Sequence, residues 1–243
     1  MPSRTVHLEL TITALSLGTW NYVSKIDTYI LQHIADPDSK GMEDGYILYF
    51  WNKLIKGGLA PHHGMKDITD ALRSYYFWNS VCYYLKGDYE RAGESLARAI
   101  HYSQDTMLIY SGYDPRHDII EGEIDKIWNT QKDSIIKEVL PDLNKDKVFP
   151  EPTSTPRYYL PRALQITYYM IKEFEEEINS VFVALAKGEP VQKLGSKYLL
   201  WALGYENLDI TRRVISETKR IGRGYKTYYY DLVLQPYVKP CRS

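Results

Sequence analysis

The sequence predicts an all-α protein built as a multi-helix bundle. Apolar residues recur at helical spacing along most of the chain, and we find no clean alternating run bounded by a tight hairpin turn. A chain of 243 residues with 44% hydrophobic residues can bury one sizeable core. We therefore expect a helical core over residues 1–140 and a C-terminal helical extension over residues 141–243, packed on the same domain.

The helices expected in the first half are separated by breaks that the sequence marks. The segment Asp36–Gly41, which contains Pro37, ends one helix, and the pair Gly57-Gly58 ends another. Gly87 stops a helix, and Asp88 caps the next one. The expected helices are 7–18, 22–34, 45–56, 67–85 and 89–109.

In the second half, Asp114 followed by Pro115 is a strong helix start, and that helix should continue to about residue 139. Residues 141–156 contain four prolines and indicate a connector. Further helices are expected at 157–187, 195–203 and 207–222, and the tail from Tyr228 is expected to be irregular.

Composition narrows the classes of function. A net charge of -1 argues against a generic binder of nucleic acid or anionic membranes, although a local basic patch stays open. Cys82 and Cys241 lie far apart in an otherwise cysteine-poor chain, so we expect reduced thiols and a cytoplasmic location. No apolar run approaches the ~20 residues of a membrane span, and the start is a poor signal peptide. The oligomeric state stays open.

Two pairs of residues could carry metal chemistry. His101 and Asp105 are four apart on a predicted helix, and His117 and Glu121 repeat this spacing one helix later. Each pair can present an imidazole nitrogen and a carboxylate oxygen to one zinc ion. Either pair alone is more typical of a solvated surface hydrogen bond. The adjacent histidines His62-His63, in a loop before a long helix, strengthen the zinc interpretation.

The run Gly87-Asp-Tyr-Glu-Arg-Ala92, followed by Ala99-Ile-His-Tyr-Ser-Gln-Asp105, resembles the central helices of zinc-dependent phospholipases C. Single-strand-specific fungal nucleases share that fold. The resemblance covers roughly residues 5–130 and is densest over 75–121. It implies a helical bundle of the phospholipase C and nuclease type that holds a cluster of one to three zinc ions.

The resemblance also implies a set of ligands. Asp105 matches an aspartate that bridges two zinc ions, and the pair His117 and Glu121 matches a separate zinc site. That site should bind weakly, because Ile109-Tyr110-Ser111 stands where the family has a further histidine. The remaining implied ligands are His101, His7, one of His62 and His63, and one of Asp38 and Asp36, with Asp44 a weaker candidate.

These residues suggest a zinc-dependent phosphoric-ester hydrolase that is similar to phospholipase C. Asp38 is the candidate base for the attacking water. The substrate would be a phosphoester, either a phospholipid or a nucleic acid. The alternative is a catalytically degenerate helical scaffold or protein-interaction module, because Gly87–Ala92 with Ala99 also resembles part of a tetratricopeptide repeat. No second copy of that pattern occurs at the required spacing.

Overall fold

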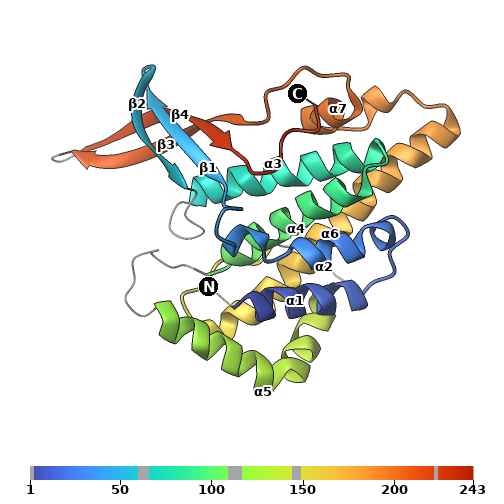
Figure 1. Ribbon diagram of the computed structural model, residues 1–243, viewed down its shortest axis with the longest axis vertical. Helices are drawn as coiled ribbons and strands as arrows, with labels where there is room; N and C mark the ends of the chain where they lie inside the picture. The colour runs from blue at the N-terminus through green and yellow to red at the C-terminus, as the bar shows by residue number, and fades with distance from the viewer. Residues whose placement is uncertain (1–2, 60–65, 109–116, 144–148, 222–223, 243) are drawn as a thin grey trace.

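The computed structural model describes residues 3–59, 66–108, 117–143, 149–221 and 224–242. A body of α-helices stands beside a four-stranded antiparallel sheet, and the sheet projects from one end of that body (Figure 1). The protein is therefore mixed α and β, and the all-α prediction was wrong.

The helices agree with the sequence pattern over most of the body. Ser3 caps α1, Asp88 caps α4, and Gly87 lies between α3 and α4 with a positive φ of 78°. The described α-helices are α1 (Arg4–Ser16), α2 (Asp27–His33), α3 (Lys66–Leu85), α4 (Tyr89–Asp105), α5 (His117–Leu143), α6 (Pro156–Lys187) and α7 (Lys197–Leu203). The described 3-10 helices are η1 (Val23–Lys25), η2 (Asp36–Asp38) and η3 (Val191–Lys193).

The sheet replaces elements that we expected to be helical or irregular. Its strands are β1 (Gly45–Phe50), β2 (Lys53–Leu59), β3 (Arg212–Ile221) and β4 (Gly224–Gln235), in the order β2-β1-β4-β3. The predicted helices 45–56 and 207–222 were wrong, as was the irregular tail from Tyr228. A short apolar run such as β1 fits a buried helix or a strand equally well. In β1–β2, Trp51 and Asn52 take positive φ values of 50° and 61°, as a tight hairpin turn requires.

Helix α4 lies at the centre of the body. It packs against α2, α3 and α6, and its side chains from Ser95 to Asp105 are all buried. Since α4 is covered on every side, polar side chains on it must find partners inside the protein. This placement brings His101 and Asp105 into the interior.

A buried ion pair joins the sheet to the body. Arg98 of α4 lies 3.3 Å from Asp44, which directly precedes β1, and both side chains are fully buried. Asp44 also accepts hydrogen bonds from the hydroxyls of Tyr76 and Tyr102 and from the backbone N–H of Tyr237, which follows β4. The Asp44 carboxylate thus holds the start of β1 and the segment that follows β4 against α3 and α4.

A disulfide between Cys82 of α3 and Cys241 fastens the C-terminal segment to the same helix. Asn79 accepts a hydrogen bond from the N–H of Cys241, and Lys86 donates one to its carbonyl. The expectation of two reduced cysteines was wrong, because the strands β3 and β4 return the chain to α3 and bring the two sulfur atoms together.

Among the described helices, none is both long enough and apolar enough to cross a membrane.

Candidate metal centre

Three elements bring four of the predicted side chains together. Helix α1 supplies His7, η2 supplies Asp38, and α4 supplies His101 and Asp105. Nε2 of His101 lies 3.3 Å from a carboxylate oxygen of Asp105 and 3.5 Å from one of Asp38. Nε2 of His7 lies 3.6 Å from the other oxygen of Asp105. The carboxylate of Asp105 therefore faces the Nε2 atoms of both imidazoles, with one oxygen near each.

The cluster is buried. The side chains of His7, His101 and Asp105 are 0% exposed, and that of Asp38 is 13% exposed. The two imidazole rings stack, with centroids 4.2 Å apart. Ligand atoms of His7, His101 and Asp105 all lie within 4.8 Å of one another. Asp38 is the member of the cluster closest to solvent.

The tautomer of His7 follows from hydrogen bonds behind it. The hydroxyls of Thr11 and Thr167 donate to the carbonyls four residues before each of them, so both oxygens are left as acceptors. Both accept from the amide NH₂ of Gln104, at 3.3 Å and 2.9 Å. The amide oxygen of Gln104 therefore faces Nδ1 of His7, at 2.5 Å, and Nδ1 must be the protonated nitrogen. Nε2 of His7 carries the lone pair, and it makes no hydrogen bond to any described residue.

His101 is held in the same way. Its Nδ1 donates to the backbone carbonyl of Ile34, 2.8 Å away, at the end of α2. A carbonyl can only accept, so this contact places a proton on Nδ1 and turns Nε2 toward the carboxylates. Metal-binding histidines are oriented by this kind of second contact, from an amide or carbonyl oxygen to the nitrogen that does not bind the ion.

The electrostatic environments of the two histidines differ. Burial, together with the neighbouring His101, lowers the pKa of His7 to about 4, so His7 is neutral at pH 7. Burial also acts to lower the pKa of His101, but the carboxylates of Asp105 and Asp38 outweigh it and raise that pKa to about 10. Without a bound cation, the proton on Nε2 of His101 supplies the positive charge that the two carboxylates require.

Tyr159, near the start of α6, completes the site. Its ring is fully buried, and its hydroxyl makes no hydrogen bond to any described residue. Burial raises the pKa of Tyr159 well above its ordinary value, and the charges of Asp105 and Asp38 raise it further. The hydroxyl thus keeps its proton beside the carboxylates and can donate a hydrogen bond to a group bound there.

The donor set fits zinc. The two Nε2 atoms and the Asp105 carboxylate are ligands that zinc takes, and three protein ligands leave the fourth position of a tetrahedral zinc ion for water. Both imidazoles already have Nδ1 engaged, which leaves Nε2 for the ion. A divalent cation would also replace the proton of His101 as the charge that balances Asp38 and Asp105.

A second, more exposed group includes Asp36, the first residue of η2. Nδ1 of His33 lies 2.6 Å from a carboxylate oxygen of Asp36, and Glu94 of α4 brings a third ligand atom within 4.8 Å. These side chains are partly exposed, and burial raises the pKa of Glu94. Asp36 and Asp38, which the sequence left as alternatives, thus belong to two different groups.

The structure does not bring every predicted ligand into the cluster. His62 and His63 lie outside the described residues. His117 and Glu121 belong to the first turn of α5, but the side chain of His117 is not among those described. Glu121 belongs to neither His and carboxylate group. Asp44 is committed to Arg98 and two tyrosines, so it is not a metal ligand.

Sequence reasoning missed the residues that support the cluster. Gln104 follows His101 by three residues, and Thr11 follows His7 by four, so helical spacing alone places each beside its histidine. Tyr159 and Thr167 carry no local signal, since they reach the cluster through the packing of α6 against α1 and α4.

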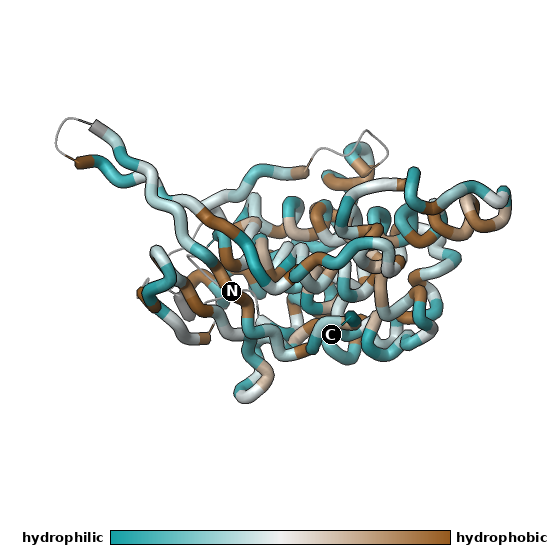
Figure 2. Tube along the Cα trace, turned by 90° about the horizontal axis from the view of Figure 1, so that it is seen from above, coloured by the Kyte–Doolittle hydropathy of each residue, from teal (hydrophilic) through white to brown (hydrophobic). Residues whose placement is uncertain are grey.

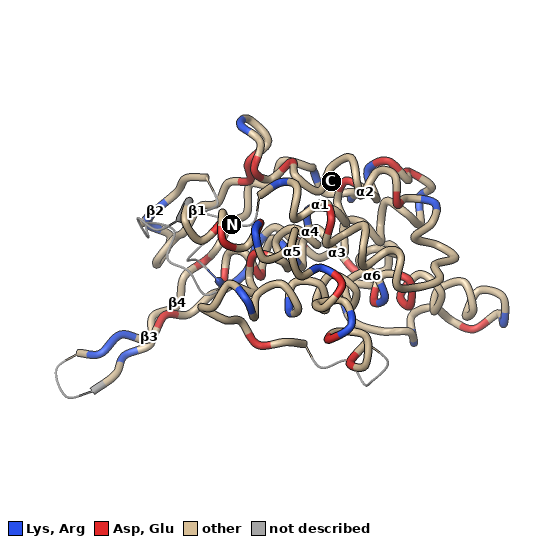
Figure 3. The backbone as a smooth tube through the Cα atoms, turned by 90° about the horizontal axis from the view of Figure 1, so that it is seen from below, with Lys and Arg blue, Asp and Glu red and all other residues tan. Residues whose placement is uncertain are grey.

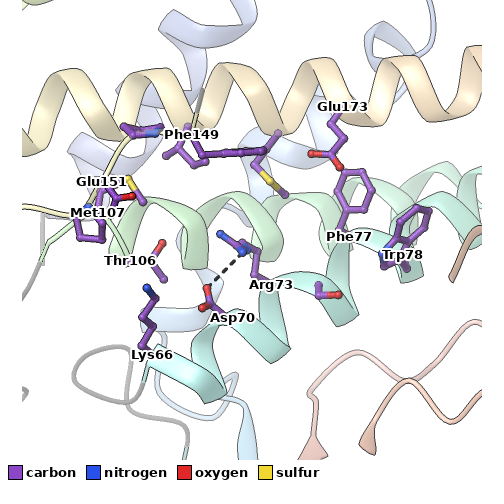
Figure 4. A pocket seen from close by; sticks show the side chains of 15 residues that line it. Lys66, Asp70, Arg73, Phe77, Trp78, Thr106, Met107, Phe149, Glu151 and Glu173 are labelled. Carbon is purple, nitrogen blue, oxygen red and sulfur yellow. Dashed lines mark ion pairs between the residues drawn. The ribbon is translucent and has the colours of Figure 1, made fainter. Parts of the chain in front are cut away.

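A cavity of about 480 Å³ lies beyond the end of α4, between α3, α6 and the connector before α6 (Figure 4). Thr106 and Met107, the two residues after Asp105, line it together with the ion pair of Asp70 and Arg73. None of the four clustered side chains lines this cavity. It therefore adjoins the cluster through the backbone of α4 without opening onto the ligand atoms.

Comparisons of this chain with models of protein families, with curated proteins and with solved structures give no match.

Proposed function

We propose that this protein is a zinc-dependent phosphoric-ester hydrolase whose metal centre is formed by His7, His101 and Asp105, with Asp38 beside them. One observation carries the proposal. Two imidazoles present Nε2 to two carboxylates inside the protein, and an amide or carbonyl oxygen holds each imidazole by its other nitrogen. Ordinary surface pairs of histidine and carboxylate lack this second set of contacts.

Each side chain has a definable part in such a centre. His7 and His101 would hold the ion through Nε2, and Asp105, whose carboxylate faces both Nε2 atoms, would hold it through oxygen. When bound, zinc polarises a phosphoryl oxygen and activates water for attack on phosphorus.

Asp38 and Tyr159 would act on the attacking water and on the substrate, respectively. Asp38 is the most exposed of the four carboxylate and imidazole side chains, so it is the one that can accept a proton from an attacking water. The protonated hydroxyl of Tyr159 can donate to a phosphoryl oxygen as negative charge develops there. The proposed substrate is a phosphoric diester, the class that the resemblance of residues 87–105 to zinc-dependent phospholipases C implies.

The second candidate is a non-catalytic scaffold in which zinc is structural. The complete burial of His7, His101 and Asp105 favours this candidate, because a catalytic ion needs an open coordination position. In the scaffold, zinc would fasten α1, η2 and α4 together and contribute to folding.

The disulfide between Cys82 and Cys241 indicates the redox environment of the protein. A bonded Cys82–Cys241 pair is typical of oxidising compartments and rare in the cytosol. We therefore propose an oxidising compartment in place of the cytoplasmic location expected from the sequence.

Metal content and hydrolysis together test these candidates. Protein purified without a histidine tag should contain about one or two zinc ions per chain by elemental analysis. It should also hydrolyse bis(p-nitrophenyl) phosphate. His101→Ala and Asp105→Asn should lose both zinc and hydrolysis, and circular dichroism would verify that at least one of them is folded.

Asp209→Asn is the matched control for Asp105→Asn, since it changes an exposed carboxylate that belongs to neither group and should leave zinc and hydrolysis in place. Zinc without hydrolysis would support the scaffold. The absence of zinc, or equal hydrolysis by folded wild-type and His101→Ala protein, would reject the enzyme.

A further inference from the structure

The β3–β4 hairpin extends beyond the rest of the sheet. Strand β1 pairs with β4 only over residues 231–235, whereas β3 pairs with β4 along its whole length. The distal residues 215–221 and 224–230 therefore form a two-stranded ribbon, here called the arm, that reaches away from the helices (Figure 1). A two-stranded ribbon has little stability in water alone, so an arm of this kind gains from a surface to bind.

One face of the arm has no cover within the described part of the chain. The register places Ser216 opposite Tyr229, Thr218 opposite Thr227, and Arg220 opposite Tyr225. All six of these side chains are exposed, with Tyr225 at 77% and Tyr229 at 64%. On the opposite face, Phe50 packs against Tyr228 and Tyr230, which shelters that side near its base.

Exposed apolar side chains are concentrated on the sheet. The described residues include 18 large apolar side chains that are exposed, and eight of them belong to the strands or to the β1–β2 turn. Trp51, in that turn, is 83% exposed, and Ile221, the last residue of β3, is 53% exposed. The others are Leu54, Ile55, Leu59, Val214, Tyr225 and Tyr229. Figure 2 shows a hydrophobic stretch of the chain next to the end of the arm.

The sheet is also basic, although the chain as a whole is not. Its strands carry seven lysines and arginines but only Glu217 and Asp231 as acids, which gives a net charge of +5 within a chain of net charge -1. The remainder of the chain therefore carries -6. Lys219, Arg220 and Lys226 stand close to the end of the arm, where Figure 3 shows basic residues on both strands. Such a separation of charge favours one orientation toward an anionic surface.

We propose that the sheet is a docking surface for anionic phospholipid membranes, with the arm and the β1–β2 turn entering the headgroup region. Trp and Tyr side chains favour this interface, and lysine and arginine next to them are attracted to anionic lipids. Single-stranded nucleic acid would also accept basic and aromatic side chains. However, Leu54 and Ile55 near the β1–β2 turn and Ile221 near the end of the arm cannot stack on bases as rings do, whereas they can enter the acyl boundary.

Vesicle sedimentation tests the proposal. Wild-type protein should sediment with vesicles of phosphatidylcholine and phosphatidylserine, much less with phosphatidylcholine alone, and less as salt is raised. The double variant K219E/R220E should weaken this binding by about tenfold or more. The double variant I221D/Y225D should weaken it to a similar extent by removing the apolar contacts.

Leu185→Asp and Lys187→Glu, near the exposed end of α6, are matched controls that should bind like the wild type. The arm variants should keep the wild-type melting temperature, because the changed side chains are exposed. Equal binding to both vesicle types, or arm variants that bind like the wild type, would overturn the proposal. So would tight binding of a single-stranded oligonucleotide, or self-association through the arm, without vesicle binding.

The docking surface does not depend on the metal centre. Protein treated with a chelator should bind vesicles as tightly as untreated protein. Loss of zinc chemistry with intact vesicle binding would reject the proposed hydrolase alone, and the converse result would reject the docking surface alone.

Discussion

The amide oxygen of Gln104 faces Nδ1 of His7 at 2.5 Å, and this contact leaves Nε2 of His7 to point into the cluster. Thr11 and Thr167 hold the Gln104 amide in that orientation, since their hydroxyl protons are used elsewhere. The chemistry available to His7 is therefore set by three neutral side chains outside the cluster.

Gln104→Leu should weaken zinc binding by about 10- to 100-fold, because Nδ1 of His7 loses its acceptor and the ring is no longer fixed. The measurement is competition with a chromophoric zinc chelator. Gln192→Leu, at an exposed position, is the control and should bind like the wild type. Unchanged affinity in Gln104→Leu would show that the contact does not orient a ligand.

Zinc binding at pH 7.5 should release about one proton. The raised pKa of His101, about 10, means that its imidazole is protonated in the metal-free protein, and it must lose that proton to bind an ion. His7 contributes little, because its lowered pKa, about 4, leaves it neutral. Calorimetry in two buffers of different ionisation enthalpy measures the number of protons. A heat that is independent of the buffer would mean that His101 is already neutral.

Tyr159→Phe should lower the turnover of bis(p-nitrophenyl) phosphate by about 100-fold while the zinc content stays the same, since the variant removes one hydrogen-bond donor from the site. The hydroxyl makes no hydrogen bond to any described residue, so its loss should cost little stability. The neighbouring Tyr158 is 54% exposed, and Tyr158→Phe should leave both the turnover and the zinc content unchanged. If the two variants behave alike, Tyr159 has no role in turnover.

Asp44→Asn should destabilise the fold by about 3–5 kcal/mol, because it removes the closer and fully buried of the two carboxylates beside the buried guanidinium of Arg98. Denaturant unfolding measures this loss. Asp209→Asn also removes a carboxylate from an arginine, but this ion pair with Arg212 is more than half exposed and should cost at most about 1 kcal/mol. A small effect at Asp44 would indicate that the sheet is not held to the body by this pair.

Reducing the Cys82–Cys241 disulfide, or replacing both residues by serine, should destabilise the protein by about 2–5 kcal/mol, since the bond closes a loop with a sequence separation of 159. Melting temperatures with and without a non-thiol reductant measure the effect, and a thiol titration verifies the redox state. Two titratable thiols in protein that was never reduced would contradict the disulfide.

The sequence predicted the helices of the body well because their ends are marked locally. Gly87 and Asp88 define the boundary between α3 and α4, and His101 and Asp105 share a face of α4 by spacing alone. His7 and Asp38 entered the candidate site only through the family resemblance. No local pattern brings α1 and η2 beside α4, and their meeting depends on tertiary packing.

The sheet was missed for two different reasons. The run of β1 is uniformly apolar and aromatic, so it carries no alternation that separates a strand from a helix. Strand β3 is rich in β-branched residues, and only two residues separate Ile221 from Gly224, which is a hairpin signal. The alternation of apolar and polar residues is weak in β3, because polar side chains occupy alternate positions on both of its faces.

The central pairing of the sheet has a consequence for how the protein is made. Gly45 of β1 is paired with Gln235 of β4. Nearly all of the chain must therefore be synthesised before β1 can pair with its second neighbour in the sheet. During translation, the segment with Tyr46 and Leu48, which ends up buried, would leave the ribosome long before β4 can cover it. The nascent chain therefore exposes one unpaired edge of the β1–β2 hairpin, and this stage is where a chaperone would be most needed.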